Sequence, residues 1–291
     1  MIVIPMAGLS SRFLNAGIKT PKFLLPAFGK TLFEHSVGSF RAHFKSEPFL
    51  FILRKAQVDP ATLETLIRHM GIADYSIAVL DHETAGQADT VRLGLAKAAV
   101  NDAEPLAIFN IDTILHEYTI PARRTQHDGM LDVFEGEGSN WSYVRTNDQN
   151  RVVETAEKRA ISRFCSTGLY FFGTAGLFRT ALQKSCDDAA YRNAEHYIAP
   201  VYNALVALNC DITIDLRNRD SVSFVGVPDE YVDFLLSGRK APGDMDKLAG
   251  ETSAKDAYAT LLAFPQDRAK ERLIATQYLE RKFPDLNLGA R

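Results

Sequence analysis

The sequence predicts an α/β fold with a doubly wound, mostly parallel sheet of the Rossmann-like type and a mixed second half. The first observation is that short apolar runs alternate with longer amphipathic stretches through the first 110 residues. This alternation is typical of βαβ units, whose strands run parallel. The second observation is that later strands follow one another at shorter spacing, which indicates a mixed extension of the sheet. Ligands of such sheets bind at the carboxyl ends of the strands.

The first half supplies four strands and three helices in alternation. Strands are expected at residues 2–5, 49–53, 77–80 and 106–110, and helices at 32–43, 60–70 and 87–100. Helical spacing puts Leu63, Leu66 and Ile67 on one face of the second helix. Val91 and Leu95 face inward from the third helix in the same way.

The second half predicts shorter elements and a boundary near its end. Strands are expected at 141–145, 152–155, 165–172 and 221–226, with a helix at 194–208. The Ala241-Pro242-Gly243-Asp244 stretch predicts a domain boundary. We therefore expect a main domain over residues 1–240 and a helical C-terminal extension over 241–291. Within 267–283, the apolar residues at near-helical spacing are Leu273, Ile274, Tyr278 and Leu279.

Charge is distributed unevenly along the 291 residues, whose formal net charge is −3. Residues 1–33 contain no acid, and their four basic residues are Arg12, Lys19, Lys22 and Lys30. A net-acidic chain is a poor binder of a nucleic-acid polymer, because that affinity needs many Lys or Arg contacts to phosphate. The local basic excess can still receive one small polyanion.

Other features predict a cytoplasmic protein without a membrane segment. No apolar run approaches the ~18–20 residues that span a membrane. The first residues read as a strand rather than as a signal peptide. The three widely spaced cysteines, Cys165, Cys186 and Cys210, fit reduced thiols better than a disulfide or a zinc site.

The loop after the first strand predicts a phosphate-binding site. Its small residues are Ala7, Gly8, Ser10 and Ser11. Such a loop lets backbone N–H groups approach phosphate oxygens closely. Arg12 can add a bidentate contact from its guanidinium to a phosphate. Pro21 restricts the backbone just before Lys22. An ordinary turn with surface lysines remains the alternative for each feature alone. The loop is neither a Walker A loop nor a Gly-x-Gly-x-x-Gly sequence.

Residues 5–34, which read PMAGLSSRF, TPKFLLP and GKTLFE in order, resemble the signature of sugar-1-phosphate nucleotidyltransferases. The likeness is to the glucose-1-phosphate thymidylyltransferase type and to capsule-precursor cytidylyltransferases, and as an ordered series it covers about residues 1–235. It implies a nucleotide-diphospho-sugar transferase fold over residues 1–240. It also implies transfer of a nucleoside monophosphate from a nucleoside triphosphate to a sugar-1-phosphate or another small phosphomonoester, with release of pyrophosphate.

One departure from the family lies in the loop. The family usually has a second glycine before Ser/Thr-Arg, and this chain has Ser10 there. If that position needs a positive φ, Ser10 is strained.

The segment 83–91 is similar to the family stretch that lies against the nucleotide base. Gly86 would allow close backbone approach to the base, and Thr84 or Gln87 would hydrogen-bond its edge. From spacing alone, the same residues also fit a helix start with a capping residue.

The resemblance gives Asp112 the role of holding Mg²⁺, which prefers carboxylate oxygens. A strand-end Asp that caps the next turn is the alternative. The family usually carries a second metal-binding Asp where this chain has Phe224. Asp215 and Asp220 are the nearby carboxylates that would replace it.

The resemblance also implies an acceptor site. Glu157 would accept hydrogen bonds from sugar hydroxyls, Lys158 would contact the acceptor phosphate, and Thr167 and Gly168 would leave room for the sugar ring. An adjacent Glu-Lys pair is otherwise most often a solvated hairpin edge. Arg12 is assigned to the departing phosphates and Lys22 to the α-phosphate or the nucleophile.

Two other classes of function stay open. A glycosyltransferase would use a finished nucleotide-sugar, although the basic loop fits a triphosphate better than a diphosphate. A non-catalytic nucleotide or sugar-phosphate binding protein would explain Phe224. The base, the acceptor, a role in surface-polysaccharide precursor synthesis and assembly into a homo-oligomer are not decided by the sequence.

Overall fold

A computed structural model describes residues 1–237 and 251–289. The expected boundary near Ala241 lies outside the described residues. The chain divides into two compact units. Unit 1 comprises Met1–Gly8, Phe40–Asn110 and Tyr118–Arg219, and unit 2 comprises Leu9–Ser39, Ile111–Glu117 and Asp220–Arg291. The division into residues 1–240 and 241–291 stays a prediction.

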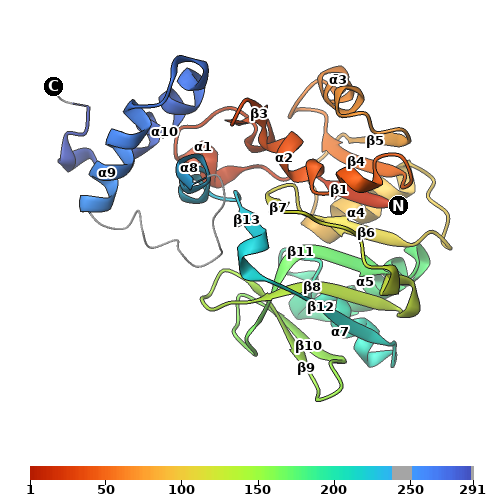
Figure 1. The fold of residues 1–291 in the computed structure, drawn as a ribbon. Helices are drawn as coiled ribbons and strands as arrows, with labels where there is room; N and C mark the ends of the chain where they lie inside the picture. The colour runs from red at the N-terminus through yellow and green to blue at the C-terminus, as the bar shows by residue number, and fades with distance from the viewer. Residues whose placement is uncertain (238–250, 290–291) are drawn as a thin grey trace. The chain divides into compact units, whose positions relative to one another are not determined.

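Unit 1 is built on a nine-stranded sheet (Figure 1). Four strands form its parallel half: β1 (Ile2–Pro5), β4 (Phe49–Arg54), β5 (Tyr75–Leu80) and β6 (Leu106–Phe109). Their order is β6-β1-β4-β5, with β1 in the interior. These strands are those that the apolar runs predict, and β1 and β6 are fully buried.

The second half of the sheet is mixed, which confirms the predicted fold class. β11 (Phe164–Phe172) runs antiparallel to β6, to β8 (Gly129–Glu135) and to β9 (Ser142–Thr146). β10 (Val152–Glu157) is antiparallel to β9, and β12 (Ile212–Arg217) is parallel to β8. The sequence did not predict β8, β12 or the helix α5 (Ala175–Asp187).

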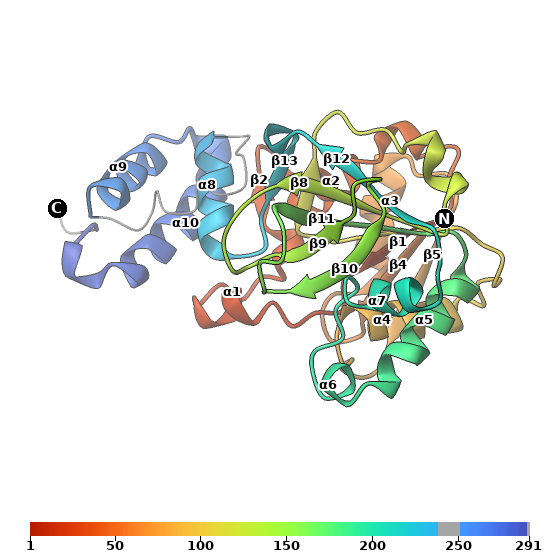
Figure 2. The ribbon, with the colours of Figure 1, turned by 90° about the horizontal axis from the view of Figure 1, so that it is seen from below.

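Three helices of unit 1 lie along one face of this sheet, namely α4 (Gln87–Lys97), α5 and α7 (Val201–Ala207) (Figure 2). They contribute buried side chains to one hydrophobic core with the strands, including Val91, Leu95, Phe178, Leu182, Tyr202 and Leu205. The helix α3 (Pro60–Met70) begins as predicted, because Pro60 follows the capping residue Asp59. The short helix α6 (Ala189–Arg192) follows α5.

Two predicted helices have wrong boundaries. The helix expected at 194–208 begins only at Val201, since Pro200 cannot continue a helix interior. The backbone of His196 pairs with residues 85 and 88 instead, with N···O distances of 2.8 Å. The helix expected at 32–43 ends at Gly38 and is followed by the 3-10 turn Arg41–His43.

Unit 2 contains two small antiparallel sheets and five α-helices among its described residues. The sheets pair β2 (Pro26–Ala27) with β3 (Lys30–Thr31), and β7 (Thr113–Leu115) with β13 (Val222–Phe224). The helices are α1 (Ser11–Asn15), α2 (Leu32–Gly38), α8 (Pro228–Ser237), α9 (Glu251–Leu262) and α10 (Ala269–Lys282). Thr31 and Glu34 form a capping box that fixes the start of α2.

The core of unit 2 joins residues from both ends of the sequence. Phe13 and Leu25 are buried with side chains of α8, α9 and α10, including Tyr231, Phe234, Tyr258, Leu261 and Leu279. α10 matches the predicted periodic stretch, except that Leu273 is 56% exposed. Within the two described ranges, no helix is long and apolar enough to cross a membrane.

Candidate functional site

Lys22 and Asp112, two of the three predicted catalytic residues, form an ion pair in unit 2. Lys22 opens the 3-10 turn η1 (Lys22–Leu24) directly after Pro21, and Asp112 lies just before β7. The Lys22 Nζ is 2.6 Å from the Asp112 Oδ2, and the side chains are 20% and 27% exposed. Both remain accessible to a ligand. An ammonium has three donors, so Lys22 can contact Asp112 and still donate to phosphate oxygens.

Glu230 is a second carboxylate beside this pair. Its Oε2 accepts hydrogen bonds from the N–H groups of Gly226, at 2.7 Å, and Val227, at 3.1 Å. A Cβ placed on Gly226 would lie 2.9 Å from the Asp112 Oδ2 and 3.4 Å from the Glu230 Oε2. The two carboxylates therefore flank Gly226 closely.

The environment of Glu230 disfavours its charge. Burial, followed by the negative charge of Asp112, raises the pKa of Glu230 to about 7, against the opposing effects of the two N–H groups and of Lys22. Sequence reasoning missed this residue, because an acid in the first turn of a helix is usually explained by the helix dipole.

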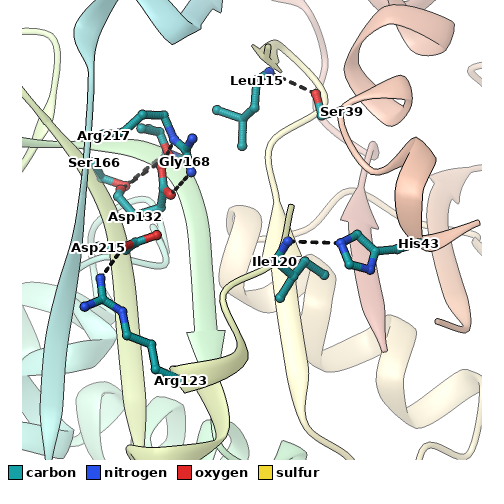
Figure 3. Close-up of polar contacts among 11 residues, drawn as sticks. Ser39, His43, Leu115, Ile120, Arg123, Asp132, Ser166, Gly168, Asp215 and Arg217 are labelled. Atoms are coloured by element: carbon teal, nitrogen blue, oxygen red, sulfur yellow. Dashed lines mark hydrogen bonds and ion pairs between the residues drawn. The ribbon is translucent and has the colours of Figure 1, made fainter. Parts of the chain in front are cut away.

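The position expected to carry a second metal-binding Asp adjoins Asp112 but is apolar. Phe224 pairs with Thr113, the residue after Asp112, and the Val225 N–H donates to the Asp112 carbonyl at 2.9 Å. Asp220 lies in the 3-10 turn Arg219–Ser221. In unit 1, Asp215 is held in an ion pair by Arg123 (Figure 3).

The donor chemistry of this cluster fits Mg²⁺. Over the part of the chain that the structure describes, no group of three or more His, Cys, Asp or Glu residues could hold a metal ion. Mg²⁺ bound with nucleotides typically takes one or two carboxylates and completes its shell with phosphates and water. Asp112 and Glu230 supply that number of carboxylates.

The N-terminal loop has the strained residue that the sequence suggested. Ser10 adopts φ 54° and ψ 33°, a left-handed conformation that favours glycine. Its carbonyl oxygen accepts hydrogen bonds from the N–H groups of Phe13 and Leu14, and these bonds start the one-turn helix α1. Ser11 and Arg12 are exposed on α1. Among the described residues, the Arg12 side chain has no hydrogen bond or ion pair.

The first part of the loop belongs to unit 1. Ala7 is buried, whereas Gly8 is exposed. The Gly8 carbonyl accepts a hydrogen bond from Gln57 at 2.7 Å. Apart from Gly8 and its two chain neighbours, no described residue lies within 4 Å of the place that a Gly8 Cβ would take, so the backbone there is open to a ligand.

The predicted base-binding segment forms the start of α4. Gly86 has φ 144°, and a Cβ there would lie 2.5 Å from the backbone nitrogen of His196. The close approach that requires glycine is therefore to His196 within the protein. The Thr84 hydroxyl contacts the Thr90 hydroxyl at 2.7 Å and the Gly86 carbonyl at 3.2 Å, which supports the helix start.

Gln87 belongs to a polar set that sequence reasoning did not assemble. Its side-chain amide donates to Asn110 Oδ1 at the end of β6. The Asn110 N–H in turn donates to the Gly168 carbonyl at 3.0 Å. Gly168 has φ 90°, and a Cβ there would lie 2.5 Å from the Asn110 amide. The structure thus brings together Gln87 and Gly168, which the resemblance assigns to base and acceptor.

Glu157 and Lys158 lie in a second polar set of unit 1. Ser142 donates a hydrogen bond to Glu157, whose pKa is raised chiefly by burial. The Lys158 Nζ donates to the Tyr197 hydroxyl at 2.7 Å, and Tyr197 donates to Glu195. Tyr197 therefore presents its polar edge to Lys158.

Thr167 is held by a buried ion pair rather than by contacts at the surface. It is fully buried, and its hydroxyl donates to Asp132 Oδ1 at 2.8 Å. Asp132 is itself 0% exposed and pairs with Arg217 at 2.5 Å (Figure 3). Thr167 thus fixes β11 next to Gly168.

Known proteins share this fold. A nucleoside-diphosphate-sugar pyrophosphorylase from Vibrio cholerae RC9 is 45% identical, with a TM-score of 0.77, over 81% of this chain and 99% of that chain. A Bacillus anthracis protein described as a glucose-1-phosphate thymidylyltransferase is 17% identical, with a TM-score of 0.61, over 78% of this chain and 89% of its own. The inositol-1-phosphate CTP transferase from T. maritima is 12% identical, with a TM-score of 0.62, over 79% of this chain and 90% of its own. The last two share the fold alone.

The fold is that of the nucleotidyltransferase class. No protein-family model and no curated protein sequence matches the chain. The likeness to the Vibrio cholerae protein nevertheless shows the family. The chain belongs to the nucleoside-diphosphate-sugar pyrophosphorylases, within the sugar-1-phosphate nucleotidyltransferase family that residues 5–34 predicted.

Proposed function

We propose that the protein transfers a nucleoside monophosphate from a nucleoside triphosphate to a sugar-1-phosphate or a related small phosphomonoester, and releases pyrophosphate. The observation that carries this proposal is the accessible Lys22–Asp112 pair beside Glu230 in a chain of the pyrophosphorylase family. A mixed cluster of this kind suits a polyphosphate and its cation, because it offers charges of both signs.

The chemistry requires positioning and charge stabilisation more than proton transfer. A phosphomonoester oxygen is already anionic near neutral pH. It attacks the α-phosphorus of the triphosphate and expels pyrophosphate. The enzyme must therefore align two polyanions and offset their repulsion. We assign Lys22 to the α-phosphate or the attacking oxygen, and Arg12 to the departing phosphates.

The remaining roles are part of the same proposal. The backbone of Ala7, Gly8, Ser10 and Ser11 binds phosphate oxygens, and the segment with Thr84, Gly86 and Gln87 binds the base. In the acceptor site, Glu157 accepts hydrogen bonds from sugar hydroxyls, and Lys158 binds the acceptor phosphate. Thr167 and Gly168 shape the space for the sugar ring. Tyr197 orients Lys158 through their 2.7 Å hydrogen bond.

Mg²⁺ is the proposed cofactor, with Asp112 and Glu230 as the residues that would hold it. When bound, the ion would offset negative charge on the phosphates. Asp112 is oriented for this role by Lys22 and by its place before β7. Glu230 is oriented by the N–H groups of Gly226 and Val227. We also propose a cytoplasmic role in surface-polysaccharide precursor synthesis, which the resemblance of residues 5–34 supports.

A pyrophosphate-release screen tests the proposal. Purified protein with Mg²⁺ is mixed with each nucleoside triphosphate and with a panel of sugar-1-phosphates and small phosphomonoesters. We expect release only when one triphosphate and one acceptor are both present. Release from no combination would contradict the proposal. Thermal stabilisation by an NDP-sugar but by no triphosphate would favour the glycosyltransferase.

Phe224 motivates one competing function, a non-catalytic binding protein. A phenylalanine cannot coordinate a cation at the position where the family places a carboxylate. This alternative predicts that a triphosphate and a sugar phosphate both raise the melting temperature while no Mg²⁺-dependent pyrophosphate is formed. The same protein sample can be used for both measurements.

A further inference from the structure

The last turn of α10 contacts two other segments of unit 2. The Arg281 Nη1 donates to the Ala16 carbonyl at 3.0 Å, just after α1. The Lys282 Nζ lies 2.6 and 2.7 Å from the two carboxylate oxygens of Asp229, in the first turn of α8. The Tyr278 hydroxyl donates to the same carboxylate at 2.7 Å. α10 is thus tied to the end of α1, which carries Arg12, and to the first turn of α8, which carries Glu230.

The helix α1 depends on these contacts because it is too short to be stable alone. It has five residues, and one helical turn does not recover the entropic cost of nucleation. Its end is fixed by hydrogen bonds from Gly17 to Leu14 and from Ile18 to Phe13, both 2.9 Å. This pattern places Gly17 in the left-handed conformation, at φ 78°.

Arg281 packs directly against that end. A Cβ on Gly17 would overlap the Arg281 guanidinium, so the side chain occupies the space that the glycine leaves. Phe13, on the opposite side of α1 from solvent, is 1% exposed in a core that includes Leu279 of α10. Arg12 directly precedes Phe13 on α1, and its side chain makes no hydrogen bond or ion pair within the described ranges. Its position is therefore set by α1, and the position of α1 by α10.

The first turn of α8 is held in a similar way. Asp229 contacts α10, whereas the next residue, Glu230, contacts Gly226 and Val227 beside Asp112. Successive helical residues point about 100° apart. Fixing Asp229 therefore fixes the direction in which Glu230 points. Burial raises the pKa of Tyr278, so its hydroxyl remains a donor to Asp229.

We propose that the last turn of α10, through Arg281 and Lys282, is a positioning element for the phosphate side of the reaction. Arg281 fixes α1 and hence Arg12, and Lys282 fixes α8 and hence Glu230. The catalytic part of this inference rests on the proposed function. The positioning part concerns the geometry of unit 2 and can be measured without any turnover.

The test compares Arg281→Ala and Lys282→Ala with Lys270→Ala. Lys270 is an exposed residue of the same helix that makes no ion pair within the described residues. The first measurement is hydrogen exchange by mass spectrometry on the full chain. We expect Arg281→Ala to speed exchange in residues 11–18, and Lys282→Ala to speed it in residues 226–231, by roughly tenfold. Lys270→Ala should leave both segments unchanged.

The second measurement is steady-state kinetics at a temperature well below the melting temperature of every variant. We expect kcat/KM for the triphosphate to fall about tenfold in Arg281→Ala and Lys282→Ala, since small misplacement of charged groups is costly. KM for the acceptor should stay within about twofold, as its proposed residues belong to unit 1. Arg281→Lys, which can still donate to Ala16, should recover most of the loss.

The outcomes separate the two proposals. A wild-type protein that releases no pyrophosphate contradicts the proposed function, while the exchange data still decide whether α10 positions α1 and α8. Unchanged exchange in both alanine variants would overturn the positioning role. Faster exchange with unaltered kinetics in an active enzyme would overturn it as well, because the contacts would then be purely structural.

Discussion

Lys22 and Glu230 differ in how readily the sequence identifies them as candidate site residues. Lys22 stands out because Pro21 precedes it and no acid lies in residues 1–33. Glu230 is surrounded by ordinary helix-start residues, and its importance comes from Asp112, which lies more than a hundred positions away. A carboxylate whose environment is set by a distant charge gives no local signal.

The role of Lys22 gives a prediction at this scale. Lys22→Ala should lower kcat roughly 100- to 1000-fold, because it removes the charge that we assign to the reacting phosphate. The melting temperature should change little, since this side chain is partly exposed. Pyrophosphate release by coupled assay measures the first effect and calorimetry the second. Lys19→Ala, an exposed neighbour in the same segment, is the control. Near-normal turnover of Lys22→Ala would remove Lys22 from the mechanism.

His43 gives a second prediction, which concerns pH. Its Nε2 accepts the Ile120 N–H at 3.0 Å, so the ring must be neutral at that nitrogen (Figure 3). Burial lowers the pKa of His43; the carboxylate of Glu47 opposes this shift and Arg124 adds to it. Below pH 6.5 the unfolded chain therefore binds more protons than the folded one, and the stability contributed by the neutral ring is lost as pH falls.

We accordingly expect His43→Gln to lose less stability than wild type between pH 7.5 and 5.5. A glutamine can still accept the Ile120 N–H but does not titrate. Urea unfolding at the two pH values measures the difference. His69→Gln, at an exposed position of α3, should behave as wild type. An identical pH dependence in His43→Gln and wild type would show that this histidine is not linked to folding.

Among the elements, the parallel half of the sheet is the part that the sequence predicts best. β1, β4 and β6 are continuous apolar runs because both faces of the sheet are covered. The strands β8 and β12 are difficult to predict from the sequence because charged residues interrupt their apolar patterns. Asp132 lies in the middle of β8, and Arg217 ends β12. Each charge is tolerated in the core only because the other neutralises it, and the two lie far apart along the chain.

The β11 strand supplies a prediction on backbone conformation. Gly168 has a positive φ at an irregularity in the pairing with β8, and it also touches Asn110. Gly168→Ala should therefore cost both backbone strain and a steric clash, about 2–4 kcal/mol together. Gly29 also has a positive φ, in the β2–β3 turn, but apart from its two chain neighbours no described residue lies within 4 Å of its Cβ position. Gly29→Ala should cost only about 1 kcal/mol.

Urea denaturation of both alanine variants measures this difference. Equal losses would mean that Asn110 moves aside freely, and that close packing at Gly168 does not constrain the strand. The comparison isolates the contact with Asn110, because both substitutions share the unfavourable backbone conformation.

For the whole molecule, the sequence predicted a main domain followed by a helical extension, whereas the contacts group α9 and α10 with residues 9–39. Periodicity identifies α10 as a helix but not the surface that it covers. Phe13, Leu25 and Tyr231 are buried by side chains of those late helices. A pattern of apolar residues predicts that one face of a helix is buried, but it does not predict which other element packs against that face.

A chain that ends at Ser237 tests which description is right. We expect it to be largely insoluble, or to bind the dye ANS strongly, because removal of α9 and α10 uncovers the apolar core of unit 2. The full chain should do neither. A soluble truncated protein with unchanged near-ultraviolet circular dichroism would instead identify residues 241–291 as an independent extension.

The interleaving of the two units along the chain has a consequence for biosynthesis. Unit 2 is assembled from residues 9–39, 111–117 and 220–291, so its N-terminal segment is made first and its core partners in α9 and α10 are made last. Contacts over such long sequence separation form slowly. During synthesis on the ribosome, Phe13 and Leu25 cannot be buried by α9 and α10 until almost the entire chain has been made. Newly made chains should therefore depend on chaperones that cover exposed apolar segments until synthesis is complete.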